Sequence, residues 1–202
     1  MKTRNLRPGL LLAALPALLL QACSGILTSE QPARQYYLLV PYETSPAAAE
    51  PMAQIGVSIT AVPGLDTDHI QTLGADSRLN RYSNARWPDH LPEVLTSVLR
   101  RSLESSGNLD TVESAAATEG AWNLQLEVRQ FYGRQDAAGD TRSVIVELAG
   151  TLVCADLRQP VRLQASSPVG EQRLSVVVAA HQSGLDSVTR ELLDLLKRSC
   201  GT

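Results

Sequence analysis

The hydrophobic pattern of this 202-residue chain changes between a period of two, typical of strands, and a longer period typical of helices. Residues 122–129 alternate without interruption between apolar and polar side chains, which predicts a strand with one buried face. Alternation resumes over residues 143–155 after turn-forming residues 137–140. The two segments therefore predict a long antiparallel hairpin, with a bulge near Phe131 and Tyr132 where the alternation shifts.

Shorter strands are predicted on both sides of this hairpin. Residues 35–40 are rich in strand-forming side chains and end at Pro41. Residues 55–62 carry aliphatic side chains at every second position, and residues 70–82 contain two short strand-like runs around a Gly-Ala-Asp turn. A last short strand is predicted over residues 161–165.

Apolar residues recur every three or four positions in two segments, which predicts two helices. The first helix begins near Pro92 and ends at Gly107. The second covers about residues 175–199, although its β-branched beginning and Gly184 leave open a strand followed by a helix from Asp186. The apolar stripe of the first helix consists of Leu91, Leu95, Val98, Leu99 and Leu103.

These elements together predict the fold class. Strands that pair mostly with sequence neighbours, combined with two amphipathic helices, indicate an α+β two-layer sandwich. Its sheet is expected to be mainly antiparallel or mixed, with both helices packed on one face. Residues 35–202 are enough for one such domain and too few to require two.

The first 22 residues have the layout of a secretory signal peptide. Lys2, Arg4 and Arg7 precede the apolar run Gly9–Leu20. As a helix this run would be about 18 Å long at 1.5 Å per residue, well short of the roughly 30 Å hydrocarbon core of a bilayer. We therefore expect residues 1–22 to be removed rather than to span a membrane.

The sequence Leu20-Gln21-Ala22-Cys23 that ends this segment resembles the lipobox of bacterial lipoproteins. The resemblance implies that Cys23 becomes the first mature residue and carries acyl chains such as palmitate. Several chains hold a protein on a bilayer, because each buried methylene contributes about 0.8 kcal/mol. The alternative is an ordinary cleaved signal followed by a chance cysteine.

Residues 23–34 would then form the lipidated terminus and a tether, because they carry Ser, Gly, Thr, Gln and Pro without an apolar period. Ser24, in place of an aspartate after the cysteine, favours the outer membrane and a domain that faces the periplasm. The inner membrane stays open as the other location.

The charge of the mature chain argues against nucleic acid as a partner. Removal of residues 1–22 leaves 15 basic and 21 acidic residues, a formal charge of −6. Nucleic-acid binders need a cationic surface to displace counterions, and the longest basic runs here are the pairs Arg100-Arg101 and Lys197-Arg198.

Two further cysteines, Cys154 and Cys200, remain in the mature chain. An exported protein meets oxidising conditions, so we predict a disulfide bond between the expected central strand and the C-terminal helix. Two buried free thiols are the alternative.

No catalytic motif is present in the sequence. It lacks the Gly-x-Ser-x-Gly elbow, His-Glu-x-x-His, a phosphate-binding glycine loop and Cys-x-x-Cys, so we predict a protein that is not an enzyme and has no cofactor. The three histidines lie far apart in sequence and are expected at the surface or at helix caps. Asp66, Asp68 and His69 are the right residue types for a cation, but they follow Pro63-Gly64 and are interpreted as turn residues rather than metal ligands.

The order of several short motifs is more informative than any one of them. After the lipobox come Tyr36-Tyr37-Leu38-Leu39, Ile55-Gly56-Val57, an aspartate-rich loop before Ile70, Arg81-Tyr82, Trp87 and Leu91. This order resembles the ABC-type transport auxiliary lipoprotein family, the group that contains paraquat-inducible protein C. The resemblance covers nearly all of the mature chain, and none of its motifs is catalytic.

The resemblance implies an outer-membrane lipoprotein that assists an envelope-spanning lipid transport system. Its partners would be ABC transporter components and a mammalian-cell-entry-type protein, and its cargo would be phospholipid. The domain would bind and hold a partner without chemistry of its own.

Exposed aromatic and arginine residues dominate interface energetics, so Tyr82, Arg86 and Trp87 in the loop before the first helix are the predicted partner contacts. The alternatives are that Trp87 belongs to the core and that an exposed strand edge pairs with the partner.

A second functional hypothesis is a lipid-binding shuttle or assembly lipoprotein with its own apolar cavity. Only 4% of the residues are aromatic, and the apolar positions are about those that a single core requires. The sequence therefore favours a docking role over a lipid carrier.

Overall fold

The computed structural model describes residues 33–44, 53–113, 119–155 and 157–201. The folded unit spans Arg34–Thr202, and Met1–Ala33 forms a separate unit. The predicted signal peptide and the predicted lipidation site Cys23 lie outside the described residues. Within the described part of the chain, none of the helices combines the length and apolar character that a membrane crossing requires.

The folded unit contains eight strands and two helices in the described residues. Their bounds are β1 Gln35–Tyr36, β2 Ala53–Ala61, β3 His69–Leu73, β4 Leu79–Arg86, α2 Leu91–Ser105, β5 Leu109–Val112, β6 Trp122–Gln135, β7 Thr141–Cys154, β8 Leu157–Pro168 and α3 Leu174–Cys200.

All eight strands belong to one mixed sheet built around β6. On one side β6 pairs antiparallel with β7, which pairs antiparallel with β8. On its other side β6 has two parallel partners, β2 along its first half and β3 near its end. Beyond these, β5 continues the sheet from β2, while β4 and then β1 continue it from β3.

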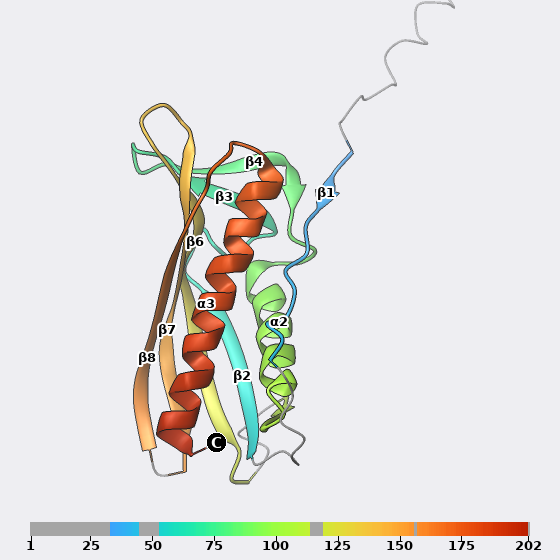
Figure 1. Cartoon of the computed structure of the whole chain (residues 1–202), viewed down its shortest axis with the longest axis vertical. Coiled ribbons are helices and arrows are strands. Elements are labelled where there is room, and N and C mark those ends of the chain that lie inside the picture. The colour runs from blue at the N-terminus through green and yellow to red at the C-terminus, as the bar shows by residue number, and fades with distance from the viewer. Residues whose placement is uncertain (1–32, 45–52, 114–118, 156, 202) are drawn as a thin grey trace, which may run out of the picture. The chain divides into compact units, whose positions relative to one another are not determined.

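Both helices cover the same face of this sheet (Figure 1). The sheet residues on that face are buried and apolar, among them Ile55, Leu124 and Leu148. Their neighbours in sequence turn to the other face, which carries polar residues such as Ser58 and Gln125. The predicted two-layer α+β sandwich with a mixed sheet is therefore confirmed.

The predicted first helix and the predicted hairpins are present. Every residue of the predicted stripe of α2, from Leu91 to Leu103, is buried against the sheet. The 122–129 alternation belongs to β6, and its long hairpin with β7 contains a bulge between Val128 and Gln130, slightly earlier than expected.

Two predicted strands need correction, one strand was missed, and one alternative that the sequence left open is decided. The strand expected over residues 35–40 is limited to β1, because the backbone leaves the sheet after the hydrogen bond from Tyr37 N to Arg86 O. The strand β8 is longer than the predicted 161–165, and the short β5 was not predicted. The ambiguous beginning of the last helix is helical, so α3 is continuous through Gly184.

Gly184 lies where α3 packs directly against β7 and β8. A Cβ atom added there would be 2.8 Å from Cγ2 of Val146 on β7 and 3.5 Å from Oγ of Ser167 on β8. The missing side chain therefore sets the separation between helix and sheet, which explains a glycine inside a helix.

We expect Gly184→Ala to lower the free energy of unfolding by about 1–2 kcal/mol, because overpacking outweighs the better helix propensity of alanine. Gly170→Ala is the matched control, since a Cβ at Gly170 meets no atom within 4 Å. Urea unfolding of both variants checks this, and a Gly184→Ala protein as stable as the parent would contradict it.

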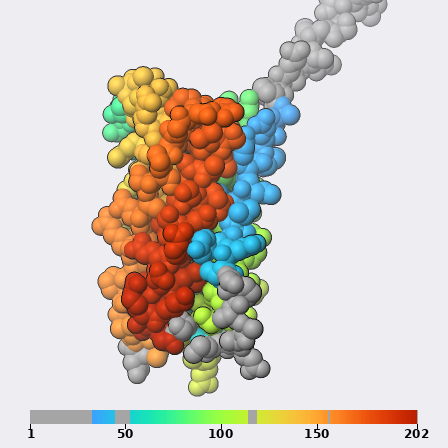
Figure 2. Space-filling model, viewed as in Figure 1, coloured from blue at the N-terminus to red at the C-terminus, as the bar shows by residue number. Residues whose placement is uncertain are grey.

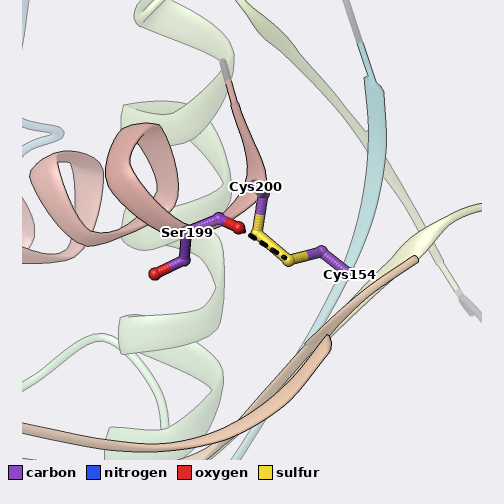
Figure 3. The surroundings of a disulfide bond; sticks show 3 residues. All are labelled: Cys154, Ser199 and Cys200. Carbon is purple, nitrogen blue, oxygen red and sulfur yellow. Dashed lines mark hydrogen bonds between the residues drawn. A yellow bond between two sulfur atoms is a disulfide. The ribbon is translucent and has the colours of Figure 1, made fainter. Parts of the chain in front are cut away.

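A disulfide bond joins Cys154 at the end of β7 to Cys200 at the end of α3 (Figure 3). The Cα atoms are 5.9 Å apart, and the cysteines are separated by 46 positions in the chain. The bond therefore holds the last turn of α3 against the sheet, where a helix end would otherwise fray.

We predict that the exported protein contains this bond and that its reduction lowers the free energy of unfolding by up to about 4 kcal/mol on the chain-entropy estimate. Gel mobility with and without reductant, together with a count of free thiols, checks the prediction. A Cys154→Ser/Cys200→Ser variant is the control, and two titratable thiols at these positions in the exported protein would contradict the bond.

Candidate functional site

Trp87, one of the three predicted partner contacts, is a core residue. Its side chain is 1% exposed. Its ring centroid lies 5.8 Å from that of Phe131 on β6 and 5.4 Å from that of His181 on α3. Trp87 therefore fills the space beneath the start of α2, as in the alternative prediction, and presents no contact area to a partner.

Arg86 and Tyr82 also bind within the domain. The guanidinium of Arg86 donates through Nη1 to the carbonyl oxygens of Tyr82 (3.2 Å) and Ala85 (3.0 Å). Its Nε lies 3.4 Å from Oδ2 of Asp68, and the side chain is 14% exposed. The hydroxyl of Tyr82 is 3.4 Å from Oγ1 of Thr141. Arg86 thus binds the backbone of β4, and Tyr82 contacts the start of β7, so the structure does not combine the three residues into one exposed surface.

The segment after β1 lies along the two helices (Figure 1), and we call residues 37–44 the strap. Its last backbone hydrogen bond to the sheet runs from Tyr37 N to the carbonyl oxygen of Arg86 on β4 (2.9 Å). The side-chain amide of Gln182 on α3 binds Val40 at both backbone groups. Val40 N donates to Oε1 (2.9 Å), and Nε2 donates to Val40 O (3.0 Å). The strap thus receives from a side chain the hydrogen bonds that a neighbouring strand would have supplied.

Residues of α2 hold the next part of the strap. Tyr42 N donates to Oγ of Ser102 (2.9 Å), and Oγ of Ser105 donates to Tyr42 O (3.0 Å). From α3, Nε of Arg190 donates to the hydroxyl of Tyr42 (3.2 Å). The strap is therefore attached to both helices, and Leu39, which is 4% exposed, inserts into the core.

Because Tyr37 and Leu39 turn inward, the alternate residues turn outward. Tyr36, Leu38 and Val40 are 58%, 68% and 56% exposed. We call these three side chains the apolar stripe. Figure 2 shows this part of the chain, in blue, on the molecular surface beside α3.

A hollow of about 230 Å³ lies next to the stripe. Its apolar wall includes Leu39 of the strap and Val94 and Val98 of α2. Its full lining is Leu38, Leu39, Pro88, Asp89, Glu93, Val94, Ser97, Val98 and Arg101. Stripe and hollow share Leu38 and therefore form one continuous surface.

The charged residues of the hollow are distributed along α2. Asp89 and Glu93 lie at the start of the helix, and Arg101 lies eight residues after Glu93, which is about 12 Å along a helix axis. Within the described residues none of the three forms an ion pair, whereas the adjacent His90 contacts Asp66 (Nδ1 to Oδ1, 2.9 Å). That hydrogen bond raises the pKa of His90.

Asp66, Asp68 and His69, the residues considered as metal ligands in the sequence, contact other side chains and do not converge on one point. Asp66 contacts His90, while Asp68 contacts both His69 (2.8 Å) and Arg86. Across the described ranges no group of three or more His, Cys, Asp or Glu side chains is arranged to hold a metal ion.

His181 was expected at the surface or at a cap, and this expectation was wrong. The ring is fully buried between Trp87 and Phe131 on the covered side of α3. Its Nδ1 donates to the carbonyl oxygen of Val177 (2.9 Å), while Nε2 has no partner among the described residues. Burial lowers the pKa of His181 to about 4, so the ring is neutral near pH 7 and suits a core rather than proton transfer.

The apolar stripe was missed in the sequence because every residue from Tyr36 to Val40 is apolar. With no polar position to identify an outer face, the run looks like a buried strand. The one available signal was Pro41, which has no backbone N–H to donate to a neighbouring strand. It therefore fits a segment that leaves the sheet.

Comparisons with known proteins agree with this fold. A family described as "ABC-type transport auxiliary lipoprotein component" matches residues 36–192. Protein XCC0632 from Xanthomonas campestris, of family DUF330, has 22% identity and a TM-score of 0.65 over 80% of this chain and 94% of its own.

A second crystal structure, of an uncharacterised protein, has 14% identity and a TM-score of 0.66 over 81% of this chain and 99% of its own. At these identities the two structures show a shared fold alone. No curated protein matches the chain.

Proposed function

Since the chain belongs to the family of ABC-type transport auxiliary lipoprotein components, we propose that it is a lipid-anchored, non-catalytic part of a lipid transport system and that it works by binding a partner protein. The observation that carries this proposal is the apolar stripe with its adjoining hollow. Large apolar side chains that stay exposed in a row are typical of interaction surfaces. The proposed function is therefore docking.

We propose that residues 1–22 are a signal peptide, that Cys23 is acylated, and that residues 23–34 tether a periplasmic domain of residues 35–202. The lipobox-like sequence and the family support this anchor. Ser24 after the cysteine favours the outer membrane as the final location.

We propose further that the docked partner is a mammalian-cell-entry-type protein that works with the ABC transporter, and that the cargo is phospholipid. The auxiliary role of the family supports the association with a transporter. The mature charge of −6, from 15 basic and 21 acidic residues, supports a protein partner over nucleic acid.

The size of this hollow argues against its use as the cavity of a lipid shuttle. Pockets that enclose small-molecule ligands usually measure about 300–1,000 Å³. At about 230 Å³ this hollow is smaller, so it suits one protruding side chain and not an enclosed phospholipid.

The experiment that tests the proposed function is cross-linking of the intact lipoprotein in cells that contain the transporter, followed by mass spectrometry of what it captures. We expect a component of the transporter among the cross-linked proteins, and its absence would contradict docking. Incorporation of a palmitate analogue, with Cys23→Ser as the control, tests the anchor. Stoichiometric phospholipid on a soluble form that begins after Cys23 would favour the shuttle.

A further inference from the structure

We propose that the apolar stripe and the hollow together bind one short apolar segment of the partner protein, and that this segment carries a cationic side chain at one end. The inference rests on the proposed docking function and adds where the partner binds and which chemistry it presents.

The distribution of exposed apolar side chains identifies the surface. Among the described residues five large hydrophobic side chains are exposed, and three of them are Tyr36, Leu38 and Val40. Single exposed apolar residues such as Leu79 and Leu157 are ordinary on protein surfaces. Three consecutive outward positions on one extended segment form a continuous apolar row, and such a row is unusual on a protein surface.

The hollow supplies the second half of the site. Its wall is made by aliphatic residues of the strap and of α2, and its volume of about 230 Å³ suits one large apolar side chain. Interfaces obtain most of their affinity from a few such anchors that fill a preformed depression. The partner segment therefore needs one aliphatic or aromatic side chain for the hollow and further apolar contacts along the stripe.

Charge gives the segment its direction. Asp89 and Glu93 lie at one end of the hollow, Arg101 lies about 12 Å away along α2, and none of them forms an ion pair within the described residues. Opposite charges at the two ends of a site favour one orientation of the ligand and exclude the reverse. A cation on the partner is expected near Asp89 and Glu93, and any acidic group near Arg101.

The strap is held ready for binding. The bonds from Gln182 to Val40 (2.9 and 3.0 Å) and from Ser102 and Ser105 to Tyr42 fix the backbone that presents the stripe. A surface that is already ordered loses little conformational freedom when a partner binds. This arrangement favours direct docking over folding of the strap upon contact.

The first experiment places a photo-cross-linking benzoylphenylalanine at position 38 of the full acylated lipoprotein in cells. Position 157 on β8, where Leu157 is exposed, is the matched control. We expect a transporter component to be captured from position 38 and not from position 157. Capture of the same component from position 157 but not 38 would overturn the proposed site while leaving the docking function intact.

Other products from position 38 would also overturn the inference. Cross-links to a second copy of this chain would indicate self-association, and cross-links to lipid alone would indicate a membrane-facing surface. Failure to capture any transporter component from either position, and from carboxylate-directed cross-linking through the 21 Asp and Glu side chains, would overturn the proposed function itself.

The second experiment tests the orientation of the bound partner segment and the chemistry of its cationic end. A synthetic peptide with the sequence of the cross-linked partner segment is the probe, and the acylation-free domain is titrated with it. We expect Leu38→Asp and Glu93→Lys to weaken binding at least tenfold, while Leu157→Asp has no effect. A peptide in which the cation is replaced by glutamate should recover affinity with Glu93→Lys.

Circular dichroism of each variant checks that the domain remains folded. Equal affinity of the parent and Glu93→Lys for the probe would overturn the predicted cationic end. Equal affinity of the parent and Leu38→Asp would overturn the stripe as part of the site.

Discussion

Replacing Trp87 with alanine is expected to lower the free energy of unfolding by about 3–5 kcal/mol, the usual cost of removing a buried tryptophan side chain. The indole is 1% exposed and contacts the rings of Phe131 and His181, so its loss leaves a large cavity between the two helices and β6. Urea unfolding monitored by circular dichroism measures the effect.

Leu38→Ala is the matched control for this prediction. Leu38 is 68% exposed, so its truncation should change the free energy of unfolding by no more than about 0.5 kcal/mol. In partner cross-linking the order of the effects should reverse. Leu38→Ala should lower the yield of cross-linked partner more than Trp87→Phe does, with both proteins compared at a temperature at which they are folded. A Trp87→Ala protein that is as stable as Leu38→Ala would contradict the core position of the indole.

The stability of the domain is expected to fall as the pH falls from about 6.5 to about 4, by about 3 kcal/mol from His181 alone. Burial lowers the pKa of His181 to about 4, whereas an unfolded histidine titrates near 6.5. Between these values the unfolded chain binds a proton that the folded domain does not. The contribution is therefore constant above about pH 6.5 and is lost progressively below it.

The variant His181→Leu should remove most of this slope, because leucine fills a similar volume without a titrating nitrogen. Urea unfolding at pH 7.5, 6, 5 and 4.5 provides the comparison. An unchanged slope in His181→Leu would show that other groups cause the acid sensitivity.

A second histidine provides the opposite sign as a control. The hydrogen bond to Asp66 raises the pKa of His90, so its stabilising contribution is present below about pH 6.5 and is lost as the pH rises through the raised value. His90→Gln should therefore make the loss on acidification larger, while His181→Leu makes it smaller. Two changes of the same sign would contradict the assignment.

The strands and helices with one buried face were predictable from sequence because burial leaves a periodic record. From Trp122 to Val128 of β6 every second residue faces the helices, and in α2 the buried positions recur with the helical period. The disulfide partners Cys154 and Cys200 were also predictable, since they are the two cysteines outside the lipobox-like sequence.

The position of the candidate site was not predictable, because it depends on contacts between distant parts of the chain. The strap begins with an unbroken apolar run, and the groups that bind its backbone, Gln182 and Ser102, are 142 and 60 positions away from Val40 and Tyr42. Likewise, nothing in the local sequence shows that Trp87 meets Phe131 and His181. Only the packing of the helices on the sheet, and of the strap on the helices, determines that an aromatic residue before α2 is core and that Leu38 is surface.

The attachment of the strap has a mechanical consequence. Tension on the chain before residue 34 reaches the domain at β1 and then through residues 37–44, whose bonds to Gln182, Ser102 and Ser105 involve two different helices. Such a load is shared among several bonds and delivered to the helical layer, while the sheet edge at β1 has two paired residues to break. A domain attached in this way resists unfolding under load from its N-terminal end, which we propose is the end tethered to the membrane.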